Sequence, residues 1–163
     1  MKYHLTLLII LLLAACSKDE KPFNLTDETI FREDITSTCF SDFTEIADED
    51  IVIRTEAEYL NLQEILRQEY IGINCDTASL PIIDFSKYTL LGKLTQGGGC
   101  SANYDREVIR DNENKEIRYS IAVEYVGACY MFIQNWNWAC VPKFPNDYSV
   151  VIHTEDSYEY PEN

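Results

Sequence analysis

The 163-residue sequence is poor in histidine, with only two, and in positively charged residues. His153 is the one histidine beyond the apolar N-terminal stretch, so a histidine-based metal site would need several carboxylates or cysteines around it. Lys and Arg number 13 against 28 Asp and Glu, and the formal net charge of −15 repels phosphate backbones. We therefore expect no nucleic-acid partner, no metal, no cofactor and no identifiable catalytic residue.

Long apolar runs are also missing, since residues 5–15 fall well short of the about 20 residues that a spanning helix needs. This short run follows Lys2 and ends in Ala14, Ala15 and Cys16, an arrangement that resembles a bacterial lipobox. Signal peptidase requires small side chains before the cysteine, and the thiol accepts the diacylglyceryl group. We expect lipid on Cys16 to hold the protein at the outer membrane, on its periplasmic face or at the cell surface.

The rest of the chain is long enough for one core of ordinary size and too short for two. The charged residues after Cys16 are typical of a solvated linker, and they also resemble a surface-export signal. The predicted organisation is a signal peptide over residues 1–15, the lipidated cysteine and a flexible tether over 16–34, and one globular domain over 35–163.

The chain contains no Cys-x-x-Cys pair, which argues against a thioredoxin-type redox motif and a zinc ribbon. Outside the cytoplasm disulfides persist, so we expect the remaining cysteines to form two disulfides and leave one odd thiol. Cys100 is predicted to pair with Cys129 or Cys140, because all three lie in the strand-rich half. The full set of candidates is Cys39, Cys75, Cys100, Cys129 and Cys140.

Hydrophobic periodicity predicts an α+β fold. Thr55 and Glu58 form a capping box, and apolar residues then recur at steps of three and four up to Tyr70, so a helix should begin here and pack on a sheet. Strands are predicted over residues 51–53, 88–94, 104–110, 115–126, 130–140 and 148–153. The turn residues 111–114 indicate an antiparallel hairpin. We expect a mostly antiparallel sheet with one packed amphipathic helix, stabilised by disulfides.

Two local patterns are candidates for binding. Gln96, Gly97, Gly98 and Gly99 lie between two predicted strands, where glycines serve either a structural turn or a binding loop. Trp136 and Trp138 alternate along a predicted strand, so their indoles point the same way. They form part of the core if they are buried and a stacking platform for a sugar or a protein if they are exposed.

Several motifs resemble the protease-complex PrcB-like family. Residues 80–92 read Leu-Pro-Ile-Ile-Asp-Phe-Ser-Lys-Tyr-Thr-Leu-Leu-Gly, and residues 141–145 read Val-Pro-Lys-Phe-Pro. The resemblance also includes residues 51–70 and extends to the C-terminus. In that family a similar strand leads to a Thr-Gly-Gly-Tyr turn, whereas Gln96 and Cys100 flank the glycines here. The resemblance implies a role in assembling a protease complex or in inhibiting a protease, and it carries no catalytic residue.

These observations favour a noncatalytic protein-binding or assembly module at the cell envelope, with a protein partner there. The alternative is a hydrolase or glycan-binding protein that acts on an envelope or extracellular polymer. A hydrolase of this kind requires two facing carboxylates, and the abundance of acidic residues alone does not identify such a pair.

Overall fold

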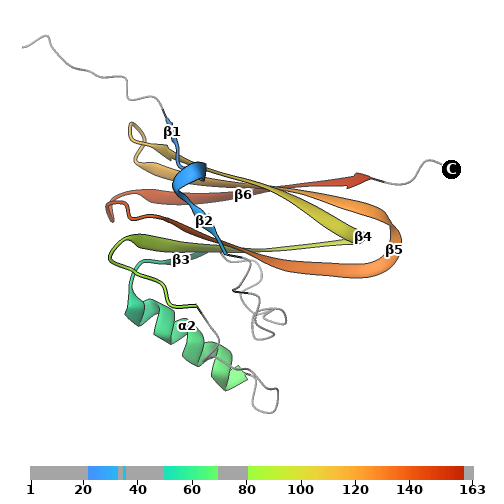
Figure 1. The fold of residues 1–163 in the computed structure, drawn as a ribbon, viewed down its shortest axis with the longest axis horizontal. Helices are drawn as coiled ribbons and strands as arrows, with labels where there is room; N and C mark the ends of the chain where they lie inside the picture. The colour runs from blue at the N-terminus through green and yellow to red at the C-terminus, as the bar shows by residue number, and fades with distance from the viewer. Residues whose placement is uncertain (1–21, 33–34, 36–49, 70–80, 160–163) are drawn as a thin grey trace, which may run out of the picture.

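A computed structural model describes residues 22–32, 35, 50–69 and 81–159, with the side chains of residues 65–69 outside the description. Figure 1 shows a mostly antiparallel β-sheet with one helix packed against it. The elements are β1 (Phe23–Asn24), the 3-10 helix η2 (Thr26–Glu28), β2 (Ile30–Phe31), β3 (Ile51–Ile53), α2 (Glu56–Glu69), β4 (Tyr88–Asp111), β5 (Glu116–Pro142) and β6 (Ser149–Glu159).

The centre of the fold is one long antiparallel hairpin of β4 and β5, which have 24 and 27 residues. The paired strands run to the right in Figure 1, bend sharply and return, so the hairpin forms two layers. Residues 88–99 and 131–142, with β2 and β3, make the helix-side layer. Residues 101–111 and 116–126, with β1 and β6, make the outer layer.

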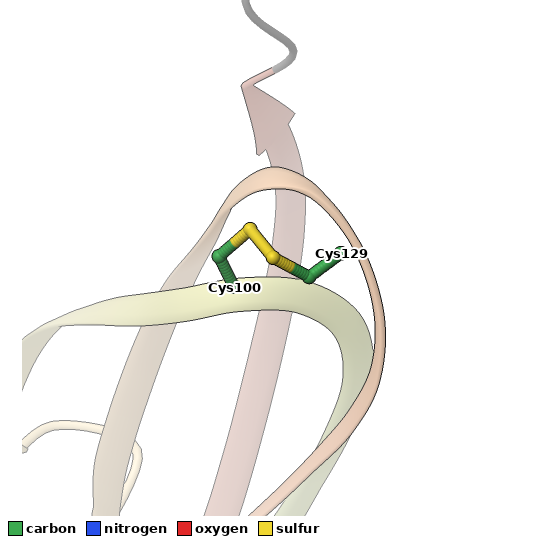
Figure 2. The surroundings of a disulfide bond; sticks show 2 residues. All are labelled: Cys100 and Cys129. Carbon is green, nitrogen blue, oxygen red and sulfur yellow. A yellow bond between two sulfur atoms is a disulfide. The ribbon is translucent and has the colours of Figure 1, made fainter.

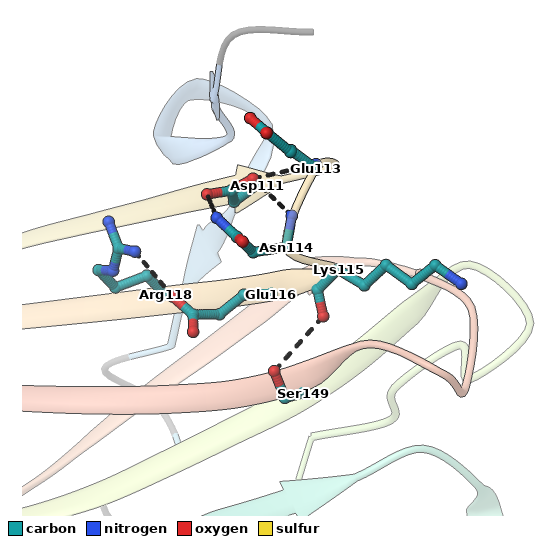
Figure 3. Close-up of polar contacts among 7 residues, drawn as sticks. All are labelled: Asp111, Glu113, Asn114, Lys115, Glu116, Arg118 and Ser149. Carbon is teal, nitrogen blue, oxygen red and sulfur yellow. Dashed lines mark hydrogen bonds and ion pairs between the residues drawn. The ribbon is translucent and has the colours of Figure 1, made fainter. Parts of the chain in front are cut away.

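The hairpin turn forms as its residue types predict. Asp111 Oδ1 accepts hydrogen bonds from the backbone N–H groups of Glu113 and Asn114, at 3.0 Å each, and Figure 3 shows this arrangement. The backbone and side-chain donors of Asn114 lower the pKa of Asp111. Lys115 completes the turn with a φ of 51°. The carbonyl of Lys115 accepts a hydrogen bond from the Ser149 N–H at 2.9 Å, which fixes the start of β6 beside the turn.

Alternation along β5 supplies most of the core between the two layers. Every second residue from Ile117 to Tyr125 is at most 1% exposed, whereas Arg118, Ala122 and Glu124 between them face solvent. These side chains pack against Leu91, Ala139 and Val141 of the helix-side layer. The predicted half-buried strand is therefore confirmed, and its buried face closes the sandwich.

A second core lies between the helix-side layer and α2. The capping box is confirmed, because the Glu58 N–H donates to Thr55 Oγ1 at 3.2 Å and the Thr55 N–H donates to Glu58 Oε2 at 3.1 Å. Tyr59 and Leu62, one turn apart, are buried against Leu90. The helix thus covers one face of the sheet, as the periodicity predicts.

Three sequence predictions need correction. Residues 96–100 do not connect two strands but lie within β4, and residues 115–126 and 130–140 likewise belong to the single strand β5. The predicted tether over 16–34 is too long, because β1 and β2 pair with the sheet. Leu25 between them is 3% exposed, so burial of this side chain ties the N-terminal segment to the core.

Candidate functional site

The bend of the long hairpin is the most distinctive surface of the molecule, and we call residues 97–101 and 126–132 the tip. The register of the two strands changes there, since Gly99 pairs with Met131 whereas Ser101 pairs with Val126. One residue of β4, Cys100, thus lies opposite four residues of β5. A bulge of this kind bends the strand pair sharply, which accounts for the two layers.

Three consecutive large side chains are exposed on the tip. The exposed fractions are 109% for Tyr130, 57% for Met131 and 69% for Phe132. At about 200 Å² for each side chain, they present roughly 450 Å² of largely apolar surface. A patch of this size equals the largest found on a typical monomer, and such patches are often functional. The tip is therefore the candidate functional site.

The tip also lacks charge, although a quarter of the chain is charged. Residues 94–104 and 125–142 contain no Asp, Glu, Lys or Arg. Tyr125 lies at the base of the tip, and its pKa is raised to about 12. Burial is the larger cause and the negative charge of Asp156 is the second, so this phenol stays neutral. The residues of the tip itself therefore offer a partner no charged group to desolvate, and the nearest charge along the sheet is Glu159, which pairs with Val126 at the base of the tip.

A disulfide fixes the bend. Cys100 of β4 and Cys129 of β5 are bonded, with their Cα atoms 4.8 Å apart (Figure 2). The sequence left open whether Cys100 pairs with Cys129 or with Cys140, and the structure shows the pair with Cys129. Cys140 is instead buried in the core of the helix-side layer. Cys39 and Cys75 lie outside the described residues. The cross-link immediately precedes Tyr130, so it restricts the motion of the exposed side chains.

The glycine run has a structural explanation. A Cβ on Gly97 would lie 2.2 Å from the Tyr125 ring, so only glycine lets the two layers close at this point. Gly99 lies against backbone atoms of the bulge, the nearest being the Val126 carbonyl oxygen at 3.1 Å. Gly98 is different, because it is exposed and its Cβ would meet nothing closer than 3.9 Å. Gln96 is also exposed.

Gly98 contributes to the candidate surface through its position. It pairs directly with Phe132, and residues directly opposite in an antiparallel pair project to the same face. Because glycine has no side chain, the exposed Phe132 ring has bare backbone beside it. The predicted binding segment thus does border the exposed apolar residues, although it is a strand and not a loop.

The tryptophan platform is not present. Trp136 and Trp138 point the same way, as the alternation predicts, but they are only 4% and 0% exposed. Their rings stack on each other with centroids 5.1 Å apart. They lie in the core beneath α2, where Trp138 occupies the space that a Cβ on Gly92 would take. The helix covers this face, so the candidate surface instead presents Tyr130 and Phe132, the exposed aromatic residues of the tip.

Elsewhere in the described part of the chain, ionisable groups form no comparable site. His153 is exposed on β6, and in the described residues no three His, Cys, Asp or Glu side chains gather as a metal site would require. A polar hollow of about 360 Å³ is lined partly by Asp27, Asp105 and Glu107. Glu107 already accepts a hydrogen bond from Asn24 Nδ2 at 2.8 Å, which links β4 to the N-terminal segment. Among the described residues, this hollow is where several carboxylates line one surface depression.

Comparison with protein-family models finds no match to the chain. Curated proteins give no match either, and no solved structure matches the fold. The resemblance to the PrcB-like family therefore stays a prediction. No helix of the described residues is long and apolar enough to cross a membrane. Cys16 lies outside the described residues, and its lipidation also stays a prediction.

Proposed function

We propose that this chain is a noncatalytic protein-binding module of the cell envelope, anchored through lipid on Cys16, that holds its partner with the tip. The observation that carries the proposal is the exposure of Tyr130, Met131 and Phe132 on a bend held by a disulfide. Aromatic residues and methionine are enriched at protein interfaces, where rigid anchors cost little conformational entropy on binding. We infer a partner surface that offers an uncharged apolar pocket.

The position of the tip relative to the predicted anchor supports this proposal. β1 pairs with Ile109 and Arg110 at one end of the long hairpin, and the tip is at the other end (Figure 1). The ten residues from Arg110 to Cys100 span about 33 Å of strand. The seven residues from Cys16 to Phe23 can extend by at most about 25 Å. A lipid on Cys16 would therefore be tethered nearer to the end opposite the tip, and the tip would be left open to a partner.

The resemblance to the PrcB-like family makes a protease complex the first class of partner to test. The tip suits this role, because an assembly factor or an inhibitor needs a rigid exposed element. The alternative of a glycan-binding protein now rests on Tyr130 and Phe132, the two exposed aromatic residues of the tip. The test below separates the two kinds of partner.

The experiment is a pull-down from the native envelope with the chain from Ser17 onward as bait. Every described core contact lies within residues 22–159, so this bait keeps the whole described core. Tyr130→Ser combined with Phe132→Ser removes the apolar tip. Ile82→Ser is the matched control, because Ile82 is 98% exposed but lies outside the tip.

We expect mass spectrometry to identify one envelope protein that the wild type and Ile82→Ser retain at high salt, since the contact is uncharged. With purified partner, the tip variant should raise Kd about 30-fold, the effect of losing a hot spot of about 2 kcal/mol. Recovery of glycan alone, recovery of nothing, or equal binding by the tip variant would overturn the proposal.

A further inference from the structure

Strand β6 ends the outer layer and is eleven residues long. It pairs in parallel with β5 from Ser149 to Glu159, and within the described part of the chain it has no second strand neighbour. The side of β6 away from β5 therefore presents backbone N–H and C=O groups that another strand can pair with. The strand contains no proline, and its pairing with β5 shows no bulge. Two common devices that block such pairing are thus missing from it.

The side chains of β6 alternate between two environments. Val150 and Ile152 pack against the core between the layers, and Val151, His153 and Glu155 are exposed on the outer face. A strand added to this edge must keep the same alternation, because a slip by one residue would place its outward side chains on the inward face. Only every second register is thus available to an added strand.

A second copy of β6 fits this edge in one antiparallel register. When the two-fold axis passes through Thr154, the middle residue of Ser149–Glu159, all eleven residues of each strand are paired. His153 of each copy then lies opposite Glu155 of the other, and no acidic residue faces another acidic residue. A slip of two residues would instead place Glu155 opposite Glu155 or His153 opposite His153. The register with the greatest overlap thus also brings His153 opposite Glu155 twice, although it places Asp156 opposite Ile152.

We propose that two copies of this chain associate by antiparallel pairing of their β6 strands about Thr154. The interface is isologous, since each copy contributes the same strand edge. β6 ends beside Val126, at the base of the tip, so the antiparallel dimer carries its two tips at opposite ends. The net charge of −15 on each chain opposes the association, and screening by salt should strengthen it. The proposal does not depend on what the tip binds.

Cross-linking of the full chain tests the register directly. Thr154→Cys places two thiols on residues directly opposite each other, whose Cα atoms are about 4.5–5.5 Å apart in an antiparallel pair. A short bis-maleimide should therefore link Thr154→Cys to itself, above the background of the wild-type cysteines. The matched controls are Val151→Cys and Ser157→Cys. In the proposed dimer, Val151 of one chain lies directly opposite Ser157 of the second chain, but about 20 Å from Val151 of the second chain, and the same holds for Ser157.

We expect no cross-linked dimer from Val151→Cys alone or from Ser157→Cys alone, and a heterodimer when the two variants are mixed. Sedimentation of the full chain in mild detergent then measures the dimer Kd. His153→Glu creates two pairs of opposed carboxylates and should raise the dimer Kd about tenfold. Combining His153→Glu with Glu155→His exchanges the two residues, restores both pairs, and should return the dimer Kd to within about twofold.

Three results would overturn the proposal. The first is a chain that remains monomeric up to roughly 100 µM. The second is equal cross-linking in the mixed and the separate Val151→Cys and Ser157→Cys samples. The third is a dimer Kd that His153→Glu leaves unchanged, or that stays raised when His153→Glu is combined with Glu155→His. Because Thr154 is half-buried and the other substituted side chains are exposed, near-UV circular dichroism should show an unchanged fold in each variant.

Discussion

Alanine substitution at two neighbouring glycines should change stability in opposite directions. A Cβ on Gly97 would lie 2.2 to 2.5 Å from three carbons of the Tyr125 ring, and this ring is 1% exposed. The ring has no free space to move into, so Gly97→Ala overpacks the core between the layers. Overpacking of this kind costs about 1–3 kcal/mol of the free energy of unfolding.

Gly98→Ala is the matched control. Its Cβ would meet only the Met131 carbonyl oxygen at 3.9 Å, which is an ordinary contact. Glycine within a strand destabilises by roughly 0.5–1 kcal/mol relative to alanine, so Gly98→Ala should stabilise the fold by about that amount. The two variants should thus differ by about 1.5–4 kcal/mol, or roughly 5–12 °C in Tm for a domain of this size.

Urea unfolding of the oxidised protein measures both changes, and a third variant identifies the cause. In a Tyr125→Ala background the ring is gone, so Gly97→Ala should lose most of its penalty in a double-mutant cycle. If Gly97→Ala and Gly98→Ala shift the midpoint in the same direction, or if the penalty persists without the ring, then contact across the two layers does not explain the glycine run.

Three further predictions concern the disulfide, the helix and a turn. Cys129→Ser opens a cross-link between residues 29 apart in sequence and should cost about 3–4 kcal/mol in urea unfolding; an unchanged midpoint would show that the bend is held without the bond. Thr55→Ala removes the acceptor for the Glu58 N–H and should cost about 1 kcal/mol, with a loss below 0.3 kcal/mol contradicting the capping role. The pKa of Asp84 is lowered to about 2, mainly by the hydrogen bond from the Ser86 hydroxyl and next by the hydrogen bond from Lys87. The ionised carboxylate therefore stabilises the fold fully above its ordinary pKa of 3.8, and this stabilisation is lost as the pH falls through 2. Asp84→Asn should therefore flatten the decline of the unfolding free energy between those pH values, and an unchanged slope would refute this.

Patterns that depend on neighbours along the chain could be predicted from the sequence. The capping box of Thr55 and Glu58 requires only a spacing of three residues and a following apolar stripe. The alternation from Ile117 to Tyr125 identifies one buried face without any knowledge of what covers it. Asp111 and Asn114 indicate the turn by their own side-chain hydrogen bonds. Each of these signals is local, and the structure contains each of them.

Most of the candidate site depends on contacts between distant residues, so the sequence identifies its glycine segment but not the exposed side chains beside it. The pattern of three glycines predicts a connection between strands, yet Gly97 is required by the Tyr125 ring, 28 positions away in the sequence. The alternation of Trp136 and Trp138 shows that they share a face but not that α2 covers it. Likewise, an apolar run such as residues 130–132 usually indicates burial, and only the bend places it in solvent. The uncharged residues on both sides of Cys100 and Cys129 were the available sequence signal.

The most direct test of the account is site-specific photocross-linking from the tip in cells that express the full chain. A benzophenone amino acid replaces Phe132 in one variant and Ile82, an even more exposed residue outside the tip, in the other. The account predicts a discrete adduct with one envelope protein from position 132, lost when Tyr130→Ser is added, and no such adduct from position 82. Adducts only with lipid or glycan, or the same protein adduct from both positions, would contradict it.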